Sequence, residues 1–149
     1  MLKIELNERN YISFIEYAIK TCNSISLVFE KSEAGANDLK YTLPEEYYLI
    51  LESVIKKENT SVHPNTGSCL ANADILFFKI DTPIISFLKQ AIDIFDWDGK
   101  KLPGELCFYR NEKIWFSCIS HERLLHIHNE TSDDLDFLKK NKIHFAYEI

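Results

Sequence analysis

Residues 105–119 read ELCFYRNEKIWFSCI, and this stretch decides which fold the chain can adopt. Two mostly apolar runs flank Asn111-Glu112, which is the pattern of two strands joined by a two-residue turn. Such a turn predicts two facing pairs: Phe108 with Trp115, and Tyr109 with Ile114. Apolar side chains then occupy both faces of the hairpin, so we expect it to lie centrally in a sheet.

Alternating or continuous apolar segments predict further strands on either side of this hairpin. Leu2, Ile4 and Leu6 alternate with polar residues, whereas residues 75–78 form a continuous apolar run, typical of a strand buried on both faces. The predicted strands are 2–6, 24–30, 74–80, 123–128 and 143–148. We expect the strand at 24–30 to lie beside the strand at 2–6.

Apolar residues at helical spacing predict three main helices and one short helix. Their ranges are 8–22, 44–57, 82–95 and 132–140. Asn7 and Asp81 are expected to cap the first and third helices, and Thr42 and Glu45 have capping-box spacing for the second. Polar residues predict a loop at 31–41, and residues 59–72 predict the longest irregular segment.

These elements predict one α+β domain spanning residues 1–149, with a mixed or antiparallel sheet and a C-terminal hairpin or meander packed by the three main helices. The composition agrees, since 46% of the residues are hydrophobic and only four are Gly and four Pro. A chain of this length buries about 68–70% of its unfolded surface, which is enough for one core.

The charge balance narrows the class of partner. Seventeen Lys and Arg against twenty-three Asp and Glu give a net charge of -6, which repels nucleic-acid phosphates and anionic lipids. Residues 1–5 lack the pattern of a signal peptide, and no stretch approaches the ~18 apolar residues that span a bilayer. We expect a cytoplasmic protein that binds neither nucleic acid nor membrane, whereas a basic protein partner is electrostatically allowed.

Four cysteines, Cys22, Cys69, Cys107 and Cys118, contain no CxxC pair. In the predicted hairpin, Cys107 and Cys118 lie diagonally on one face, about 7–8 Å apart, which is too far for a relaxed disulfide. We expect buried, reduced thiols that bind no zinc, as in a reducing compartment.

Motifs for catalysis and metal binding fail on their spacing. His121-Glu122 and His126 are one residue too far apart for HExxH, and residues 94–105 resemble an EF-hand loop but lack its first carboxylate. His126 and His128 would share a strand face that His144 could join, although structural histidines are commoner than such metal sites. No GxSxG elbow or Gly-rich phosphate loop is present. The sequence predicts no enzyme, no cofactor and no metal site.

Two acidic clusters are candidate contacts with a partner. Carboxylates around an aromatic side chain suit a basic protein surface, although a Trp that closes the end of a core helix fits the same pattern. Acids in the first turn of the short helix also complement its dipole. The candidate residues are Asp93, Asp96, Trp97 and Asp98 in the first cluster and Asp133, Asp134 and Asp136 in the second.

Residues 102–116, LPGELCFYRNEKIWF, and the following His121-Glu122 resemble a hairpin segment of small uncharacterised bacterial proteins. In its size, acidity, lack of motifs and α+β pattern, the chain also resembles the immunity proteins of bacterial polymorphic and contact-dependent toxin systems. This resemblance implies a cytoplasmic protein that neutralises a cognate toxin domain by binding it, often through acidic side chains that occupy a basic nuclease surface. It assigns no role to an individual residue.

A second function class stays open from the sequence. A small enzyme or a small-ligand-binding protein could use a pocket at the edge of the sheet, near the predicted 59–72 loop. A toxin inhibitor acts through one tight interface, so its partner should remain bound during purification, whereas a pocket enzyme should be recovered alone.

Overall fold

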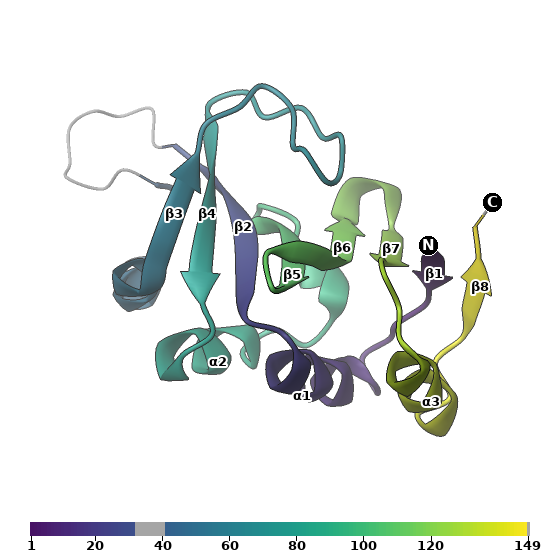
Figure 1. Cartoon of the computed structure of the whole chain (residues 1–149). Helices are drawn as coiled ribbons and strands as arrows, with labels where there is room; N and C mark the ends of the chain where they lie inside the picture. Colours follow the sequence, from purple (N-terminus) through teal and green to yellow (C-terminus); the bar gives the residue numbers. More distant parts are fainter. Residues whose placement is uncertain (32–40, 149) are drawn as a thin grey trace.

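One antiparallel sheet of eight strands organises residues 1–31 and 41–148, the part of the chain that the computed structural model describes (Figure 1). The strand order is β3-β4-β2-β5-β6-β7-β1-β8. The strands are β1 (Leu2–Ile4), β2 (Ser24–Glu30), β3 (Val54–Glu58), β4 (Ala73–Lys79), β5 (Gly104–Arg110), β6 (Lys113–Ile119), β7 (Leu124–Ile127) and β8 (Phe145–Tyr147). The predicted α+β fold is therefore confirmed. Most of the loop predicted at 31–41 lies outside the described residues.

Helices connect these strands and pack beside them. The α-helices are α1 (Tyr11–Thr21), α2 (Thr82–Leu88) and α3 (Ser132–Lys140). Three further segments are 3-10 helices: η1 (Glu45–Ser53), η2 (Ile94–Asp96) and η3 (Ser120–Glu122). Figure 1 shows α2, α1 and α3 in a row along one side of the sheet.

The two faces of the sheet differ in chemistry. On the helix-covered face, three neighbouring residues of β2, β5 and β6 are fully buried and apolar: Ile25, Phe108 and Phe116. On the opposite face, the corresponding neighbours are small and mostly polar, yet also buried: Ser26, Cys107 and Ser117. The apolar face therefore supplies the main core, and the second face combines these buried polar residues with a smaller apolar cluster of Val28, Leu70, Ala73 and Ile75.

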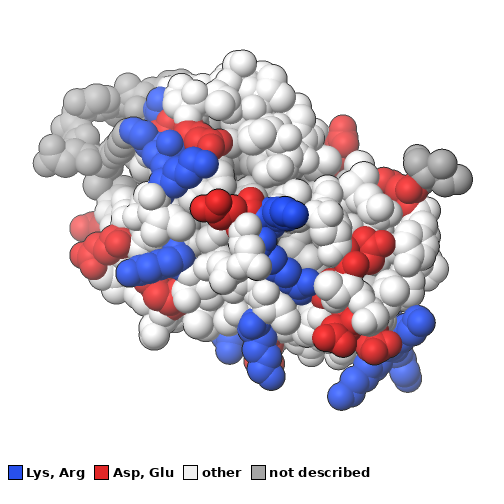
Figure 2. Space-filling model, viewed as in Figure 1, with Lys and Arg blue, Asp and Glu red and all other residues white. Residues whose placement is uncertain are grey.

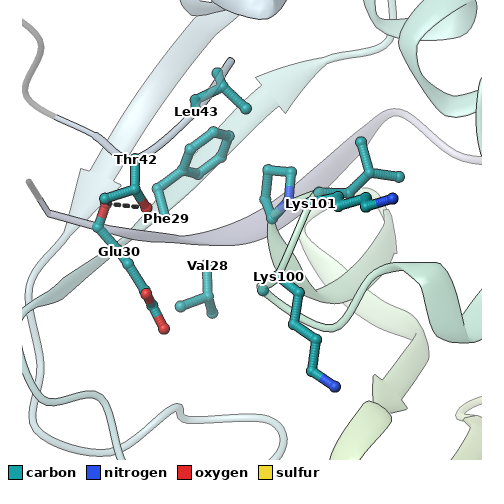
Figure 3. Close-up of a pocket in the computed structure, with 10 residues that line it drawn as sticks. Val28, Phe29, Glu30, Thr42, Leu43, Lys100 and Lys101 are labelled. Atoms are coloured by element: carbon teal, nitrogen blue, oxygen red, sulfur yellow. Dashed lines mark hydrogen bonds between the residues drawn. The ribbon is translucent and has the colours of Figure 1, made fainter.

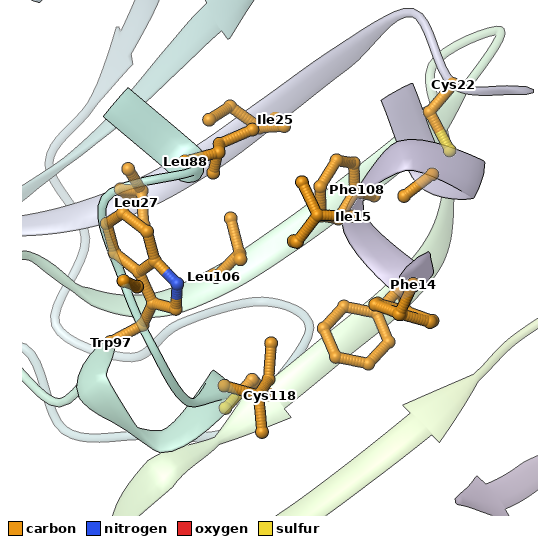
Figure 4. Close-up of a cluster of buried hydrophobic side chains, with 14 of the residues drawn as sticks. Phe14, Ile15, Cys22, Ile25, Leu27, Leu88, Trp97, Leu106, Phe108 and Cys118 are labelled. Carbon is orange, nitrogen blue, oxygen red and sulfur yellow. The ribbon is translucent and has the colours of Figure 1, made fainter. Parts of the chain in front are cut away.

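Side chains from distant segments meet in the main core. Figure 4 shows Ile15 of α1 near Phe108 of β5, and Trp97 beside Leu106. The buried indole Nε1 of Trp97 donates to the Tyr11 hydroxyl at 2.9 Å, and that hydroxyl donates to the Leu88 carbonyl at 2.7 Å. These two hydrogen bonds connect η2, α1 and α2 while satisfying polar atoms that burial would otherwise destabilise.

A β-bulge shifts the register of the β5–β6 hairpin. Tyr109 pairs with Ile114, as predicted, but Phe108 pairs with Phe116, so the predicted Phe108–Trp115 pair is wrong. Trp115 is the extra residue of the bulge, so Trp115 and Phe116 both join the core on the helix-covered face.

The same register shift separates two cysteines that the sequence places on one face. Cys107 lies opposite Ser117, which puts Cys107 and Cys118 on different faces of the sheet. All four cysteines are free thiols in the structure, but Cys69 is exposed rather than buried. Burial raises the pKa of the Cys107 thiol to about 12, so this thiol stays protonated at neutral pH.

The helix predicted at 44–57 is wrong. Residues 45–53 form the 3-10 helix η1, and residues 54–58 form strand β3. The expected capping box is absent, because Pro44 precedes η1 and no side chain caps it. Val54 and Ile55 are β-branched, and pairing with β4 supplies this segment with inter-strand hydrogen bonds instead of helical ones.

The helix predicted at 82–95 ends at Leu88. Asp81 caps α2 as predicted, since its carboxylate accepts the Ile84 N–H at 3.2 Å. Asp93 and Asp96 then form a capping box for η2, which starts a new turn instead of extending the first helix. Ile92, which the predicted helix would have placed on its apolar face with Leu88, is consequently 67% exposed.

Two other expectations at the N-terminal end are wrong. Helix α1 begins at Tyr11 because the Asn7 side chain accepts the N–H groups of Arg9 and Asn10 at 2.9 and 3.3 Å, which holds a turn before the helix. Strand β2 pairs with β4 and β5, whereas β1 pairs with β7 and β8. Strands from the far end of the chain therefore complete the sheet around β1.

An ion pair between the partly buried Arg110 and the buried Asp134 joins the hairpin to the flanking helices. Arg110 at the end of β5 donates to both carboxylate oxygens of Asp134 in α3, at 3.0 and 2.9 Å. The hydroxyl of Tyr17 and the indole of Trp115 donate to the same carboxylate at 2.6 and 3.0 Å. Burial alone would raise the pKa of Asp134, but the hydrogen bonds from Arg110 and Tyr17 lower it to about 2.

Replacing Asp134 by Ala should lower the free energy of unfolding by about 3 kcal/mol, because it leaves the partly buried Arg110 without its counter-ion and the buried Trp115 indole N–H without its acceptor. Asp133 is the matched control, since it occupies the same helical turn but is exposed. The D133A variant should lose less than about 1 kcal/mol. Urea unfolding of both variants measures the difference, and equal losses would contradict a structural role for the ion pair.

Candidate functional site

A groove of about 890 Å³ opens between η1 and the segment that follows α2; we call it the η1–α2 groove. Residues 42–47 line one part of it and residues 90–102 line the rest. Its lining includes Glu46, Tyr47, Ile92, Asp96, Asp98 and Leu102. A cavity of this size is large enough to hold several side chains of a partner.

Apolar side chains form much of the groove. Leu43 and Ala91 are buried beneath it, while Tyr47 packs edge-on against Phe87 with ring centroids 5.0 Å apart. Ile92 stands 67% exposed at its margin. An apolar side chain this exposed gains from being covered, so the groove has the chemistry of a contact surface.

Two smaller cavities adjoin the groove and share lining residues with it. One cavity, of about 130 Å³, is lined by Leu49 and Pro83 and shares Tyr47 with the groove. The other is a narrow cavity of about 10 Å³ where Thr42 and Leu43 lie near Phe29 and across from Lys100 (Figure 3). Thr42 is held there by its backbone N–H, which donates to the Glu30 carbonyl at 3.1 Å.

Charged side chains of both signs line the groove. Three are acidic, Glu46, Asp96 and Asp98, and two are basic, Lys100 and Lys101. Figure 2 likewise shows acidic and basic side chains interspersed on the face that it presents, without one continuous acidic area. The face in Figure 2 therefore carries no broad acidic field, and the groove lining has only one more acid than bases.

The residues of the first acidic cluster have different roles, because some stabilise the fold and others lie at the surface. Trp97 is fully buried, so the expectation that it anchors a partner is wrong, and it instead closes the core as the alternative explanation held. The Asp96 carboxylate accepts the N–H groups of Ile92 and Asp93 at 2.9 and 3.0 Å, a local role that the sequence did not reveal. Asp98 is exposed and accepts the Lys100 N–H at 3.0 Å. Asp96 and Asp98 line the groove, and Asp93 does not.

The second acidic cluster is also split. Asp134 is 1% exposed and bound to Arg110, so the expectation that it contacts a partner is wrong. Asp133 and Asp136 are exposed on α3. In Figure 1, α3 lies near β7 and β8, at the far end of the helix row from α2, so the structure does not unite the two clusters in one surface.

The sequence did not predict the buried polar site that lies beneath residues 59–72. The side-chain amide of Asn65 donates to the Tyr109 hydroxyl at 2.9 Å. That hydroxyl lies 2.8 Å from the Ser26 hydroxyl. His63 is 1% exposed, and its Nδ1 accepts the N–H groups of Asn65 and Thr66. Its Nε2 has no hydrogen-bond partner among the described residues. The contacts of Tyr109 with Asn65 and Ser26 join residues far apart in the sequence, which no local motif predicts, whereas those of His63 are local.

Glu105 is the second unusual group under this segment. Its side chain is 10% exposed, its Oε2 lacks a partner among the described residues, and its backbone has a left-handed φ of 54°. Burial raises the pKa of this carboxyl, which the hydroxyls of Thr66 and Ser68 and the nearby His121 oppose. A sequence signal existed, since Glu105 is the one carboxylate inside a run that is otherwise apolar up to Tyr109.

The predicted histidine face does not form a three-histidine site. His126 contacts Glu148 at 2.9 Å, and His128 contacts the Ser117 hydroxyl at 2.9 Å. The rings of His126 and His128 are 6.2 Å apart. Within residues 1–31 and 41–148, no group of three or more His, Cys, Asp or Glu side chains is placed to hold a metal ion.

Comparisons with known proteins returned no relative: no family model, no curated protein and no solved structure matches the chain. Among the helices of the described residues, none is both long and apolar enough to cross a membrane.

Acidification should destabilise the protein through His63. Burial lowers the pKa of His63 from 6.5 to about 4, so the unfolded chain binds a proton that the folded chain excludes. Stability from this group is complete above pH 6.5 and declines as the pH falls toward 4, by up to about 3 kcal/mol. In urea unfolding at several pH values, H63Q should remove this part of the pH dependence. Parallel profiles for both proteins would contradict the role of His63.

Proposed function

We propose that the chain is a non-catalytic binding protein of the immunity type, which neutralises a cognate bacterial toxin by direct protein–protein contact in the cytoplasm. Its partner is a toxin domain with a basic surface, and neither a cofactor nor nucleic acid takes part. The observation that carries the proposal is the η1–α2 groove, in which exposed apolar side chains and carboxylates occur together.

The chemistry of the groove favours a protein partner. Protein interfaces combine an apolar centre with a polar, charged rim. Ile92 and Tyr47 provide apolar surface, and Glu46, Asp96 and Asp98 provide negative charge beside it. Carboxylates at such a rim attract a basic surface during encounter and repel phosphate groups.

Helix η1 adds further acidic side chains beside the groove. Glu45 and Glu46 are exposed in its first turn, and its last turn carries no basic residue. Leu49, in the same helix, is 61% exposed. The helix therefore presents both kinds of side chain that a basic, partly apolar partner surface needs.

Charge reversal tests the proposal and separates the two candidate surfaces. The double variant E46K/D98K should slow association with the cognate partner about tenfold or more at low salt, because attraction becomes repulsion at the groove. The double variant D133K/D136K makes the same change in net charge on α3 and is the matched control. Surface plasmon resonance at low and high salt measures both association rates.

The outcomes bear on different parts of the proposal. Slower association of E46K/D98K alone supports the groove as the docking face, and a smaller effect at high salt supports electrostatic steering. Slower association of D133K/D136K alone places the interface at α3 instead. If neither variant changes association, or if the native host yields no protein partner, recognition of a basic partner is contradicted.

The rival function, a small-ligand protein or enzyme, has one observation in its favour. Glu105 is a buried carboxyl beneath residues 59–72, close to where the sequence predicts a pocket, and one of its oxygens is unpaired among the described residues. Raised carboxyl pKa values are common at active sites. The E105Q variant separates the functions, because a binder that uses the η1–α2 groove should keep its partner affinity when Glu105 changes, whereas an enzyme that uses this carboxyl should lose its activity.

A further inference from the structure

We infer that the η1–α2 groove receives an extended segment of the partner in which basic and apolar side chains alternate. This inference rests on the proposed function and adds how the partner is recognised. A single long segment, and not a flat patch of the partner's surface, would then carry the contact.

The hollow around the groove is elongated. The 130 Å³ cavity shares Glu46, Tyr47 and Gln90 with the groove, and the narrow cavity shares Thr42, Leu43 and residues 100–102 with it. The groove and the 130 Å³ cavity therefore form one trough, lined from Pro83 to Leu102, and the narrow cavity adjoins it but is too small to hold a side chain. An extended chain, which advances about 3.3 Å per residue, fills such a trough better than a compact ligand does.

Apolar side chains occur at intervals along the trough. Leu49 lies at one end, Tyr47 follows, and Ile92 and Leu102 line the central groove. Leu49 and Ile92 are 61% and 67% exposed, so each has surface left to cover. A segment with apolar side chains at intervals would cover several of them at once, as extended peptides do when alternate side chains enter pockets.

Charged side chains also line the trough. Glu46 comes from η1, whereas Asp96 and Asp98 come from the segment after α2, so carboxylates reach the central groove from two separate elements. Lys100 and Lys101 line the side shared with the narrow cavity and disfavour a further cation there. Basic side chains therefore fit the central groove, where their aliphatic stems can also rest on Tyr47 and Ile92.

Model peptides test the inference without the natural partner. One probe is acetyl-Lys-Leu-Lys-Leu-Lys-amide, and its control, acetyl-Lys-Gly-Lys-Gly-Lys-amide, has the same charge and no apolar side chain. Titration of the ¹⁵N-labelled full chain should shift the amide signals of residues 43–49 and 90–102 with the leucine peptide. The glycine peptide should bind about fivefold or more weakly.

A pair of protein variants checks that the effect belongs to the groove. I92S should weaken binding of the leucine peptide by about fivefold, because it removes an exposed contact without disturbing the core. I55S is the matched control, since Ile55 is 60% exposed on β3 and does not line the groove. I55S should bind as the unchanged chain does.

Several results would overturn the inference. These are equal binding of the two peptides, amide shifts outside the trough, absence of binding, or equal loss in I92S and I55S. An acidic peptide, acetyl-Glu-Leu-Glu-Leu-Glu-amide, that bound equally well would overturn the preference for basic side chains. Because these measurements contain no toxin, their failure leaves the charge-reversal experiment on the cognate partner as a separate test of the proposed function.

Discussion

The bidentate ion pair between Arg110 and Asp134 is the contact on which the arrangement of hairpin and helices depends. Its two charges are largely removed from water, so they are tolerable only while each keeps the other and the surrounding donors. Arg110 also stacks over Trp115 at 4.2 Å and donates to Thr21 at the end of α1. The β-bulge at Trp115 makes this possible, because it brings the indole to the helix-covered face within reach of Asp134. One bulge and one ion pair thus fix α1 and α3 on the sheet.

The η1–α2 groove follows from a second set of contacts on the same helix. Tyr11 lies ten residues before Thr21 in α1, and its hydroxyl joins Leu88 of α2 to the indole of Trp97. Asp93 and Asp96 then use their carboxylates to start η2, which turns the chain away from α2 and leaves Ile92 outside the core. A continuous helix through residue 95 would have buried Ile92. The interrupted helix creates the exposed apolar edge on which the proposed function relies.

Local patterns in the sequence predict those parts of the fold that local interactions decide. Strand β2, the turn at Asn111-Glu112 and helix α3 were predicted with nearly the observed bounds, since alternation, turn residues and caps determine them. The bulge at Trp115 was missed, because two adjacent aromatic residues fit either register equally well. The sequence reasoning did not tell Asp133 from Asp134 either: Asp134 forms a capping box with Thr131 and also binds Arg110, and the second contact spans 24 residues. Glu105 was missed because Thr66, Ser68 and His121, from separate segments, surround its carboxyl. His63 was missed although its hydrogen bonds are local, because they follow no recognisable motif.

The face formed by η1, the end of α2 and residues 90–102 is the proposed contact with the partner. Hydrogen–deuterium exchange of the chain alone and in complex with its cognate partner tests this contact most directly, because amides at an interface become protected whatever the chemistry of the contact. We expect new protection at residues 42–50 and 90–102, with little change in α3. Protection confined to α3, or to residues 59–72, would contradict this assignment.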